Sequence, residues 1–343
     1  MKKRVGLVVD DRYLKHTIVR PSPENPERIR TLSATVRERY RQDCVIYPAR
    51  AATVADIEAV HSRFYLEQLS EHELRPEPYS YDRDTYLMEH SVATALLAAG
   101  GCLELADRIM TGELEHGFAM IRPPGHHAEP GRGMGFCIFN NVSVTAQYLR
   151  RRYQLSRILI LDFDAHHGNG TQEVFYDTEE VLFISVHQRD IFPFTGKASE
   201  TGTGKGQGYT INVPVFAQFG DTEYTFLLGR ILQSVVEQYL PQIILVSAGY
   251  DGHRDETISG TLLSTEWFGL ITAMLKQYAH ETCGDRLLMV LEGGYNPVCL
   301  EGSVLATLDS LLSSRRDKIG VSFSDRANRL LKNHPMQSWW TLQ

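Results

Sequence analysis

The sequence predicts an α/β fold: a single-domain, three-layer sandwich in which a mostly parallel, eight-stranded sheet has helices on both faces. Short runs rich in valine, isoleucine and leucine alternate with longer stretches of helical periodicity. This alternation is typical of parallel strands joined by helices that cover both faces of the sheet. No break in composition divides the 343 residues, and polar clusters follow several strands. We therefore expect one domain over 1–343, with a peripheral tail at 315–343.

Each element follows from its local pattern. Eight short apolar runs, enriched in β-branched residues, are predicted strands. In chain order they are 4–9, 44–47, 117–121, 157–163, 181–186, 209–213, 242–247 and 286–291. Stretches with apolar residues at helical spacing are predicted helices. They are 26–40, 53–61, 88–110, 140–153, 221–239, 265–280 and 297–312. Thr53 and Thr265 begin two of these helices and are predicted N-caps.

Composition and charge exclude several classes of function. The net charge of −7 gives the chain no basic footprint for nucleic acid. The five cysteines include no Cys-x-x-Cys pair, which argues against a disulfide framework or a thiolate zinc site. The first apolar run is too short for a signal peptide, and no run is long enough to span a membrane. We therefore expect a cytoplasmic protein without membrane or nucleic-acid partners.

Two glycine-rich stretches, 122–135 and 195–208, are predicted loops at strand ends. The second lacks a final Gly-Lys-Ser/Thr and leads into a strand, which argues against a nucleotide site. The segment 315–332 carries six basic and two acidic residues. We expect a solvated surface segment there, with a small docking patch as the alternative.

The strongest functional signal follows the fourth predicted strand, where the chain reads LILDFDAHHGNG. Asp162, Asp164 and His166 continue one face of this strand at a period of two. Carboxylates and an imidazole that converge at the end of a buried strand suit a divalent transition metal. The pattern therefore predicts metal-assisted hydrolysis.

Three further polar groups follow other predicted strands, at 126–127, 250–251 and 292–295. Any one of them alone is more often a helix cap, a turn residue or an ordinary loop histidine. The carboxyl ends of parallel strands meet at one edge of a sheet, so all four groups can share one crevice. Their coincidence favours a functional site over four separate structural roles.

Six ordered motifs resemble the histone deacetylase superfamily: PENPERI, RPPGHHA, GFCIFNN, DFDAHHGNGTQ, SAGYD and EGGYN. They are most similar to class II and bacterial deacetylase-like amidohydrolases. The resemblance implies an arginase-like sandwich around an eight-stranded parallel sheet, in agreement with the predicted strands. It also implies that Asp164, His166 and Asp251 bind the metal. Zinc is the expected ion, and ferrous iron competes because oxygen-rich sites without thiolate select weakly between the two.

The resemblance also assigns the acid and base chemistry. His127 matches the general base, which then gives its proton to the leaving amine, and His126 matches a histidine that stabilises charge and orients the water. The matching partners are Asp162 for His126 and Asn169 for His127. Because no anion is paired with it, His127 should be less basic. For Asp162, a strand-end aspartate satisfied by backbone amides is the alternative.

Tyr295 matches the family's catalytic tyrosine, whose hydroxyl donates to the scissile carbonyl as it becomes an oxyanion. Gly293 and Gly294 would let the backbone bring this tyrosine close to the metal. A packed tyrosine without a catalytic role is the alternative, but it fits poorly after two glycines. The tyrosine implies that the chain is a competent lysine deacetylase.

The walls of the family's acyl-lysine tunnel match Gly135, Phe136 and Phe192, and two facing rings suit an aliphatic lysine stem. Taken singly, each phenylalanine is better explained as a core residue. The chain departs from the common Pro-Gly-Thr-Gly turn, because Phe194 replaces the first glycine and could reshape the rim. Arg28 matches an arginine associated with acetate exit, with a helix-surface arginine as the alternative.

The resemblance places potassium at two sites. The residues of the first are Asp162, Asp164, His166, Ser185 and Val186, which contribute mostly oxygen atoms. The residues of the second are Phe175, Thr178 and Val181.

Three functions compete. The first is a zinc-dependent amidohydrolase that removes acetyl or another short acyl group from lysine ε-amines of proteins or peptides. The second is an acetylpolyamine amidohydrolase. Specialists of that kind place an acidic residue at the mouth, where this chain has Ile258, although Glu256 lies nearby. The third is an inactive acyl-lysine or metal-binding module, which the complete set of chemical groups disfavours. An arginase-type ureohydrolase would need more aspartates. Acyl length and oligomeric state stay open.

Overall fold

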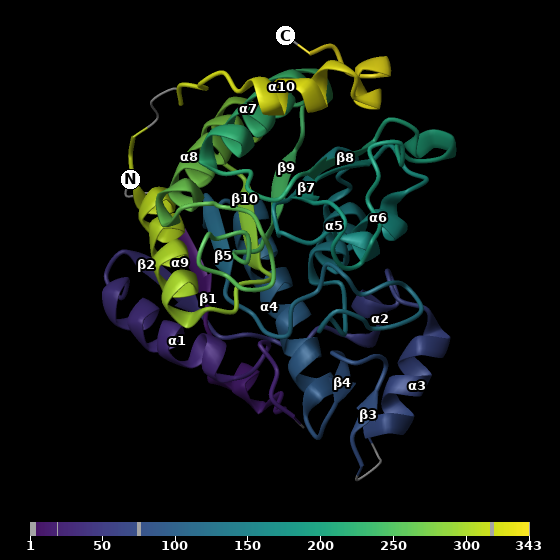
Figure 1. The fold of residues 1–343 in the computed structure, drawn as a ribbon. Coiled ribbons are helices and arrows are strands. Elements are labelled where there is room, and N and C mark those ends of the chain that lie inside the picture. The colour runs from purple at the N-terminus through teal and green to yellow at the C-terminus, as the bar shows by residue number, and fades with distance from the viewer. Residues whose placement is uncertain (1–4, 19, 74–76, 316–318, 343) are drawn as a thin grey trace.

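The computed structural model describes residues 5–18, 20–73, 77–315 and 319–342. Within these ranges, eight strands form one sheet whose neighbouring pairs all run parallel, which confirms the predicted fold class. The order across the sheet is β2-β1-β5-β10-β9-β6-β7-β8 (Figure 1). Their bounds are β1 Val5–Val8, β2 Cys44–Tyr47, β5 His116–Ala119, β6 Ile158–Asp162, β7 Val181–Gln188, β8 Thr210–Val215, β9 Ile243–Ala248 and β10 Leu287–Leu291.

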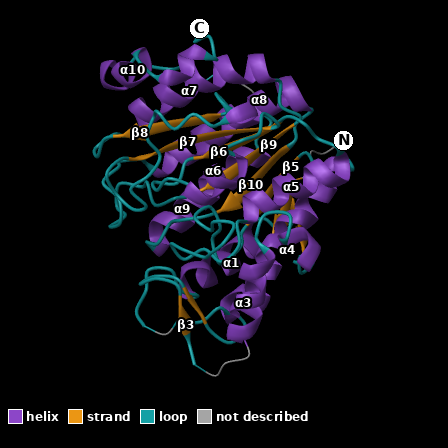
Figure 2. Ribbon diagram, turned by 90° about the vertical axis from the view of Figure 1, so that its right-hand side faces the viewer, coloured by secondary structure: helices purple, strands orange, loops and turns teal. Residues whose placement is uncertain are grey.

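Helices cover both faces of the sheet (Figure 2). One layer contains α1 (Glu27–Arg39), α7 (Asp221–Tyr239), α8 (Thr265–Cys283) and α9 (Pro297–Leu312). The other contains α4 (Ser91–Met110), α5 (Asn141–Tyr153) and α6 (Asn169–Phe175). Every residue of the central strands β6, β9 and β10 is buried between these layers. That is why these strands are continuous apolar runs and not alternating ones.

Shorter elements lie outside the sandwich. They are α2 (Val54–Ile57), α3 (Arg63–Glu73), the hairpin of β3 (Tyr79–Ser80) and β4 (Tyr86–Leu87), α10 (Asp325–Lys332), and three 3₁₀ turns, η1 (Asp11–Lys15), η2 (Gly204–Gly206) and η3 (Pro335–Ser338). The sequence did not predict α3, α6, α10 or the hairpin. Helix α6 begins inside the Gly-Asn-Gly segment, where low helix propensity hides it.

The two predicted N-caps have different outcomes. Thr53 caps α2 with a full capping box, because its hydroxyl accepts from Asp56 N and the Asp56 carboxylate accepts from Thr53 N. The prediction for Thr265 is wrong. Ser264 caps α8 by accepting from Trp267 N at 3.2 Å, so Thr265 is already helical.

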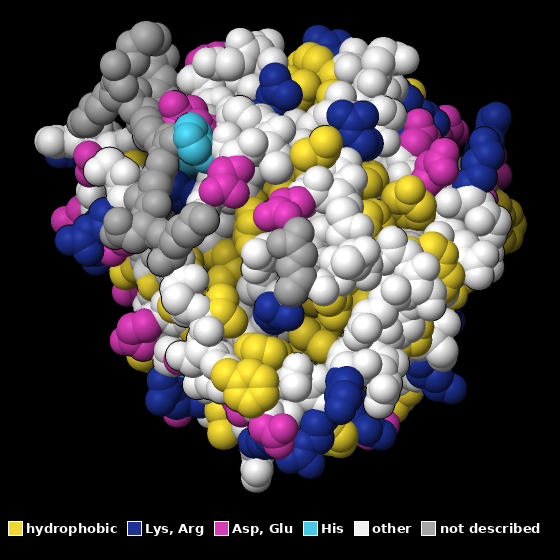
Figure 3. All heavy atoms as spheres, turned by 90° about the horizontal axis from the view of Figure 1, so that it is seen from above, with side chains coloured by type: hydrophobic (Ala, Val, Ile, Leu, Met, Phe, Trp, Pro, Cys, Tyr) yellow, Lys and Arg dark blue, Asp and Glu magenta, His cyan; other side chains and the backbone are white. Residues whose placement is uncertain are grey.

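The C-terminal segment packs on the body of the protein. Helix α10 lies against α7 at the top of Figure 1, and its residues Ala327 and Leu331 are buried. Farther along, Trp340 donates its indole N–H to Gly208 O at 2.7 Å. Within the segment predicted to be solvated, residues 316–318 lie outside the described residues, and α10 has one apolar face in the core and charged residues outside. On the molecular face seen from above, positive and negative side chains are interspersed around hydrophobic ones (Figure 3).

None of the helices in the described ranges combines the length and apolar character needed to cross a bilayer.

Candidate active site

Four strands that are neighbours in the sheet carry the candidate site at their carboxyl ends. The order β5-β10-β9-β6 places the loops after these strands side by side, and Figure 2 shows loops gathered along this edge. His126 and His127 follow β5, Tyr295 follows β10, and Asp251 follows β9. Asp162 ends β6. Polar side chains separated by more than 160 residues thus meet at one edge, as the sequence predicted.

Asp164, His166 and Asp251 form a cluster that could bind a metal ion. One ligand atom from each residue lies within 4.8 Å of the others. His166 Nδ1 is 2.8 Å from Asp251 Oδ2 and 3.1 Å from Asp164 Oδ1. Two carboxylates and one imidazole at this spacing suit zinc and leave coordination positions for water and substrate. The donor set therefore fits the expected ion.

Backbone groups orient the two carboxylates. Gly293 N donates to Asp164 Oδ2 at 2.9 Å, and Ala165 N donates to Asp251 Oδ1 at 2.9 Å. A Cβ at Gly249 would lie only 2.0 Å from Asp164 Oδ2, and one at Gly293 only 2.5 Å away. Glycine is therefore required at both positions because the chain passes directly over the carboxylate.

Charge is balanced inside the cluster. Burial would raise the pKa of Asp164, but the neighbouring imidazoles of His126 and His166 outweigh it and keep this pKa below its usual range. Burial raises the pKa of Asp251 to about 6. At His166, burial is outweighed by Asp251 and Asp164, and its pKa rises to about 10. The two carboxylates thus attract the positively charged imidazole. A bound divalent cation would be attracted by the same two carboxylates in its place.

His126 is paired with a buried carboxylate. Its Nδ1 lies 3.0 Å from Asp162 Oδ2, and both side chains are almost fully buried. Burial disfavours the charged ring, but Asp162 and Asp164 outweigh it and raise the pKa of His126 to about 10. A Cβ at Gly168 would lie 2.2 Å from Asp162 Oδ2, so the chain also passes close to this pair. Asp162 also accepts from Asp164 N at 3.1 Å, so the backbone-satisfied role that sequence analysis offered as the alternative is present too.

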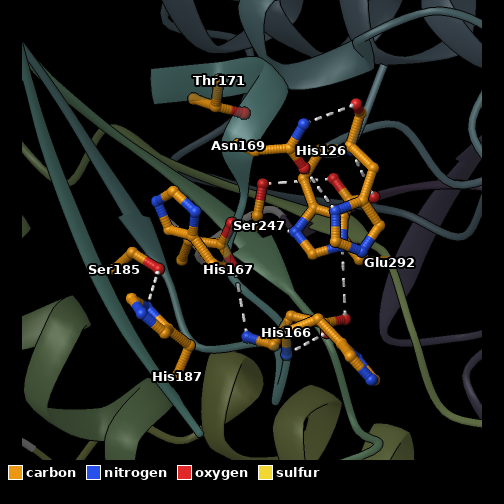
Figure 4. Close-up of polar contacts among 12 residues, drawn as sticks. His126, His166, His167, Asn169, Thr171, Ser185, His187, Ser247 and Glu292 are labelled. Atoms are coloured by element: carbon orange, nitrogen blue, oxygen red, sulfur yellow. Dashed lines mark hydrogen bonds and ion pairs between the residues drawn. The ribbon is translucent and has the colours of Figure 1, made fainter. Parts of the chain in front are cut away.

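A second carboxylate, Glu292, lies close to His126 (Figure 4). It accepts from Gly125 N at 2.6 Å, from His126 N at 3.2 Å and from the Ser247 hydroxyl at 3.1 Å. Burial raises the pKa of Glu292 to about 7. Glu292 was predicted to lie at this edge, without a role of its own. Its hydrogen bonds show that it fixes the backbone from which His126 projects.

His127 is paired with an amide. Its Nδ1 lies 2.8 Å from Asn169 Oδ1, and its ring centroid is 4.0 Å from that of His126. Burial, together with the nearby rings of His126 and His166, lowers the pKa of His127 well below its usual range. His127 is therefore neutral at pH 7, in the direction that the sequence predicted.

A pocket of about 380 Å³ opens onto these groups. His127 forms part of its wall, and the Phe192 ring stands edge-on to the imidazole with centroids 5.0 Å apart. Gly135 has φ +55°, and a Cβ there would lie 2.6 Å from the His127 ring. The predicted residues that line the pocket are His126, His127, Gly135, Phe136, His166, Phe192, Ile258 and Tyr295. Phe194 is not among the lining residues and is 74% exposed.

Tyr295 faces Phe136 across this pocket, with ring centroids 5.6 Å apart. Gly294, just before it, has φ +117°, which only glycine adopts readily. Glu256 fixes the backbone beyond: its Oε1 accepts from Tyr295 N at 2.6 Å and from Asn296 N at 2.8 Å. Glu256 is therefore engaged with the backbone and is not a free carboxylate at the pocket mouth.

Arg28 is buried, so the helix-surface alternative is wrong. Its guanidinium donates to the carbonyl oxygens of Gly294 and Glu292 and lies 4.9 Å from the centroid of the Tyr295 ring. It is also 3.6 Å from Glu24, which pairs with the buried Arg122. This network was not predicted, and its only sequence signal is that Glu24, Arg28 and Arg122 lie within the motifs PENPERI and RPPGHHA.

The residues predicted for potassium lie in two groups. Ser185 on β7 is the direct register partner of Asp162 on β6, and Val186 follows it. Phe175, Thr178 and Val181 follow one another from the end of α6 to the start of β7. The first group adjoins the metal cluster, while the second lies at the opposite end of β7.

The lining of the pocket also includes residues that sequence analysis did not single out. Asp82, Arg83 and Asp84 come from the loop between β3 and β4, and Pro23 comes from the segment before α1. Asp82 is engaged locally, because its Oδ1 accepts from Asp84 N at 2.8 Å. Their only sequence signal is a pair of aspartates between two weak strands, which predicts no more than a turn.

Comparison with known proteins identifies the family. The model of the histone deacetylase domain matches residues 22–311. The chain belongs to the histone deacetylase family. A probable deacetylase of Archaeoglobus fulgidus is 39% identical over 299 residues, covering 85% of this chain and 81% of the relative. Histone deacetylase 10, chloroplastic, of Oryza sativa is 35% identical over 315 residues, covering 89% and 71%.

A solved structure agrees with this membership. The crystal structure of the HDA15 HD domain superposes with a TM-score of 0.91 at 31% identity, covering 99% of this chain and 96% of that one. The resemblance in the motifs is thereby confirmed. As a member of the histone deacetylase family, the chain is a hydrolase of amide bonds, a deacetylase acting on an acetylated substrate.

Proposed function

We propose that this deacetylase is zinc-dependent and removes acetyl or other short acyl groups from the ε-amine of lysine in proteins or peptides. The observation that carries the proposal is one apolar pocket whose wall contains His126, His127, His166 and Tyr295, with Asp164 and Asp251 beside His166. In this proposal Asp164, His166 and Asp251 bind zinc, with ferrous iron as the alternative ion.

A divalent cation bound there would lower the pKa of a water molecule toward neutrality and polarise the substrate carbonyl. His127 is neutral and donates Nδ1–H to Asn169, so its Nε2 lone pair is free to accept a proton from the attacking water. The same nitrogen then delivers this proton to the departing amine. His126, kept positive by Asp162, orients the water and stabilises the negative charge.

Tyr295 donates its hydroxyl hydrogen to the oxyanion that forms on the substrate carbonyl. Burial raises the pKa of Tyr295 well above its usual range, so the hydroxyl keeps its proton at neutral pH. A preorganised donor of this kind supplies about 3–4 kcal/mol of transition-state stabilisation. Gly293, Gly294 and Arg28 set its position through the backbone, and an acetate exit past Arg28 belongs to the same proposal.

The shape of the pocket favours a linear substrate. The rings of Phe136 and Phe192 line the pocket together with Gly135 and Ile258, and this lining suits the aliphatic stem of lysine. Potassium ions at the two groups described above, and a cytoplasmic location, complete the proposal. In the first potassium group the cation would share Asp162 with the His126 dyad.

Acetylated polyamines are a second candidate substrate, because Asp84 lines the pocket and is exposed to solvent. An exposed carboxylate there would attract the second cation of a polyamine. Asp84→Asn would then lower kcat/KM for polyamines more than for acetyl-lysine peptides. An equal effect on both substrates would remove this candidate.

The deciding experiment compares acetyl-lysine peptides, longer acyl-lysine peptides and acetylated polyamines on zinc-loaded enzyme. We expect the highest kcat/KM for acetyl or another short acyl group on lysine. Tyr295→Phe should lose about 100-fold or more in kcat while its zinc content, measured by elemental analysis, stays at the wild-type value. Turnover of none of the lysine substrates, or an unchanged kcat in Tyr295→Phe, would contradict the proposal.

A further inference from the structure

The side-chain amide of Asn169 has an acceptor end and a donor end, and its orientation decides what His127 can do. Asn169 Oδ1 is 2.8 Å from His127 Nδ1, while Asn169 Nδ2 donates to Glu129 Oε1 at 2.9 Å. A carboxylate can only accept, so Glu129 requires the NH₂ group on its own side. The amide oxygen must then face His127, which has to carry its proton on Nδ1.

We propose that Glu129 is a positioning residue for His127, acting through Asn169. The chain Glu129–Asn169–His127 fixes one tautomer of the imidazole and leaves Nε2 as the unprotonated nitrogen. This inference rests on the proposed role of His127 as the base.

Glu129 is itself fixed. Arg132 donates to its other carboxylate oxygen, Oε2, at 2.7 Å, and Glu129 N bonds to Arg132 O at 3.0 Å in the same turn. The carbonyl of Glu129 accepts from the buried His61 at 3.0 Å. The side chain of Glu129 is 23% exposed, so its attraction for the amide is only partly screened. A carboxylate anchored at both the backbone and the side chain can set the rotamer of the amide beside it.

The same contact explains why position 169 is an amide here. An aspartate at 169 would bring a second carboxylate to within about 3 Å of Glu129, and like charges at this distance cannot both remain ionised without a large cost. One of them would take up a proton or turn away, and His127 would lose its defined partner. Glu129 and Asn169 are therefore a matched pair. An aspartate at 169 should work only when residue 129 can donate.

The test uses zinc-loaded, full-length enzyme and an acetyl-lysine peptide. Glu129→Ala should lower kcat about 10-fold with little change in KM or zinc content. Asn169→Asp should lower kcat about 10-fold or more. The double variant Glu129→Gln/Asn169→Asp should recover kcat about 10-fold over Asn169→Asp alone, because the glutamine NH₂ can donate to the new carboxylate.

Glu173→Gln is the matched control, because Glu173 lines a cavity of about 620 Å³ together with Glu129 and Asn169 but makes no hydrogen bond to Asn169. It should leave kcat unchanged, and melting temperatures identify any variant that loses stability. A double variant no faster than Asn169→Asp alone would overturn the pairing, as would an Asn169→Asp enzyme with wild-type kcat.

His127→Ala separates this inference from the proposed function. If His127→Ala keeps wild-type kcat, the base role fails and the positioning role fails with it. If His127→Ala is slow while the double variant shows no recovery, the proposed function stands and only the role of Glu129 is wrong.

Discussion

Two neighbouring histidines in this site have opposite electrostatic environments. The rings of His126 and His127 are 4.0 Å apart and both are buried, yet the pKa of the first is raised to about 10 and that of the second is lowered. The difference comes from the charges around each ring. His126 has the carboxylates of Asp162 and Asp164 beside it, whereas His127 has a neutral amide partner at Asn169 and the rings of His126 and His166 nearby. Burial lowers the pKa of both rings, so the neighbouring charges decide the sign.

Two identical side chains in one site can thus perform two different tasks. A ring kept positive by an anion can stabilise charge and orient water, but it has no lone pair to accept a proton. A ring kept neutral beside an amide has that lone pair. On the His127 side, the carboxylate of Glu129 contacts the amide of Asn169 and not the imidazole itself. It therefore orients the amide without stabilising a positive charge on the His127 ring.

The largest expected effect comes from removing the His127 imidazole. His127→Ala should lower kcat by about 10²- to 10⁴-fold, because it removes the group that transfers the proton. Zinc content measured by elemental analysis should stay at the wild-type value, since His127 is not among the three clustered ligands. If kcat falls only as far as zinc content falls, His127 acts through the metal site and the base role is wrong.

A second variant weakens binding of the cation and leaves the pairs His126–Asp162 and His127–Asn169 in place. Asp251→Asn should weaken zinc binding by more than about 100-fold, because losing a ligand exceeds the 10- to 100-fold effect of an outer-shell partner. Equilibrium dialysis followed by elemental analysis measures this directly. A full zinc complement in Asp251→Asn would exclude Asp251 from the ligand set.

A third variant gives both histidines an amide partner. Asp162→Asn replaces the buried anion by an amide, so the pKa of His126 should fall toward that of His127, and kcat should drop about 10-fold. Ring-nitrogen NMR measures the pKa, and assays repeated at high potassium concentration separate this effect from weakened binding of that ion. A His126 that stays charged at pH 7 would show that Asp162 does not set its state.

The smallest expected effect is on stability. It concerns His61, whose imidazole bonds to the carbonyl of Glu129. Burial lowers the pKa of His61 to about 4 from 6.5 in the unfolded chain. Between these values the unfolded state binds a proton that the folded state does not, so stability falls as pH drops through this window. At pH 5 the loss is about 2 kcal/mol.

His61→Gln removes this titration because the glutamine amide does not ionise. It can still donate and accept hydrogen bonds at any of these pH values. Urea unfolding at pH 7 and pH 5 should show that the variant loses about 2 kcal/mol less than the wild type over this interval. The same pH dependence in both proteins would show that His61 is not the group responsible.

Sequence patterns predicted most of the framework and the residues of the site. The eight strands were predictable because β6, β9 and β10 are continuous apolar runs, and the site followed from polar groups placed directly after such runs. Helix α6 was not predictable, because its first residues are the glycine-flanked Asn169 and its neighbours. Its stability comes from packing that sequence patterns do not record.

The acidic residues that hold the site's side chains and backbone in place were not predictable, for a different reason. Glu129, Glu292 and Glu256 are ordinary acidic residues in sequence, and their roles depend on backbone N–H groups or an amide that the fold brings to them. The cap of α8 shows the same limit on a small scale. Ser264 and Thr265 are both good capping residues, and only the local backbone decides between them.

The opposed states of the two imidazoles can be measured most directly from the protons on their ring nitrogens. ¹⁵N NMR of histidine-labelled, metal-free enzyme at pH 7 reports them, with His126→Gln and His127→Gln variants to assign the signals. We predict that His126 carries protons on both nitrogens and that His127 carries one, on Nδ1. A His127 that is positively charged, or that carries its proton on Nε2, would contradict it.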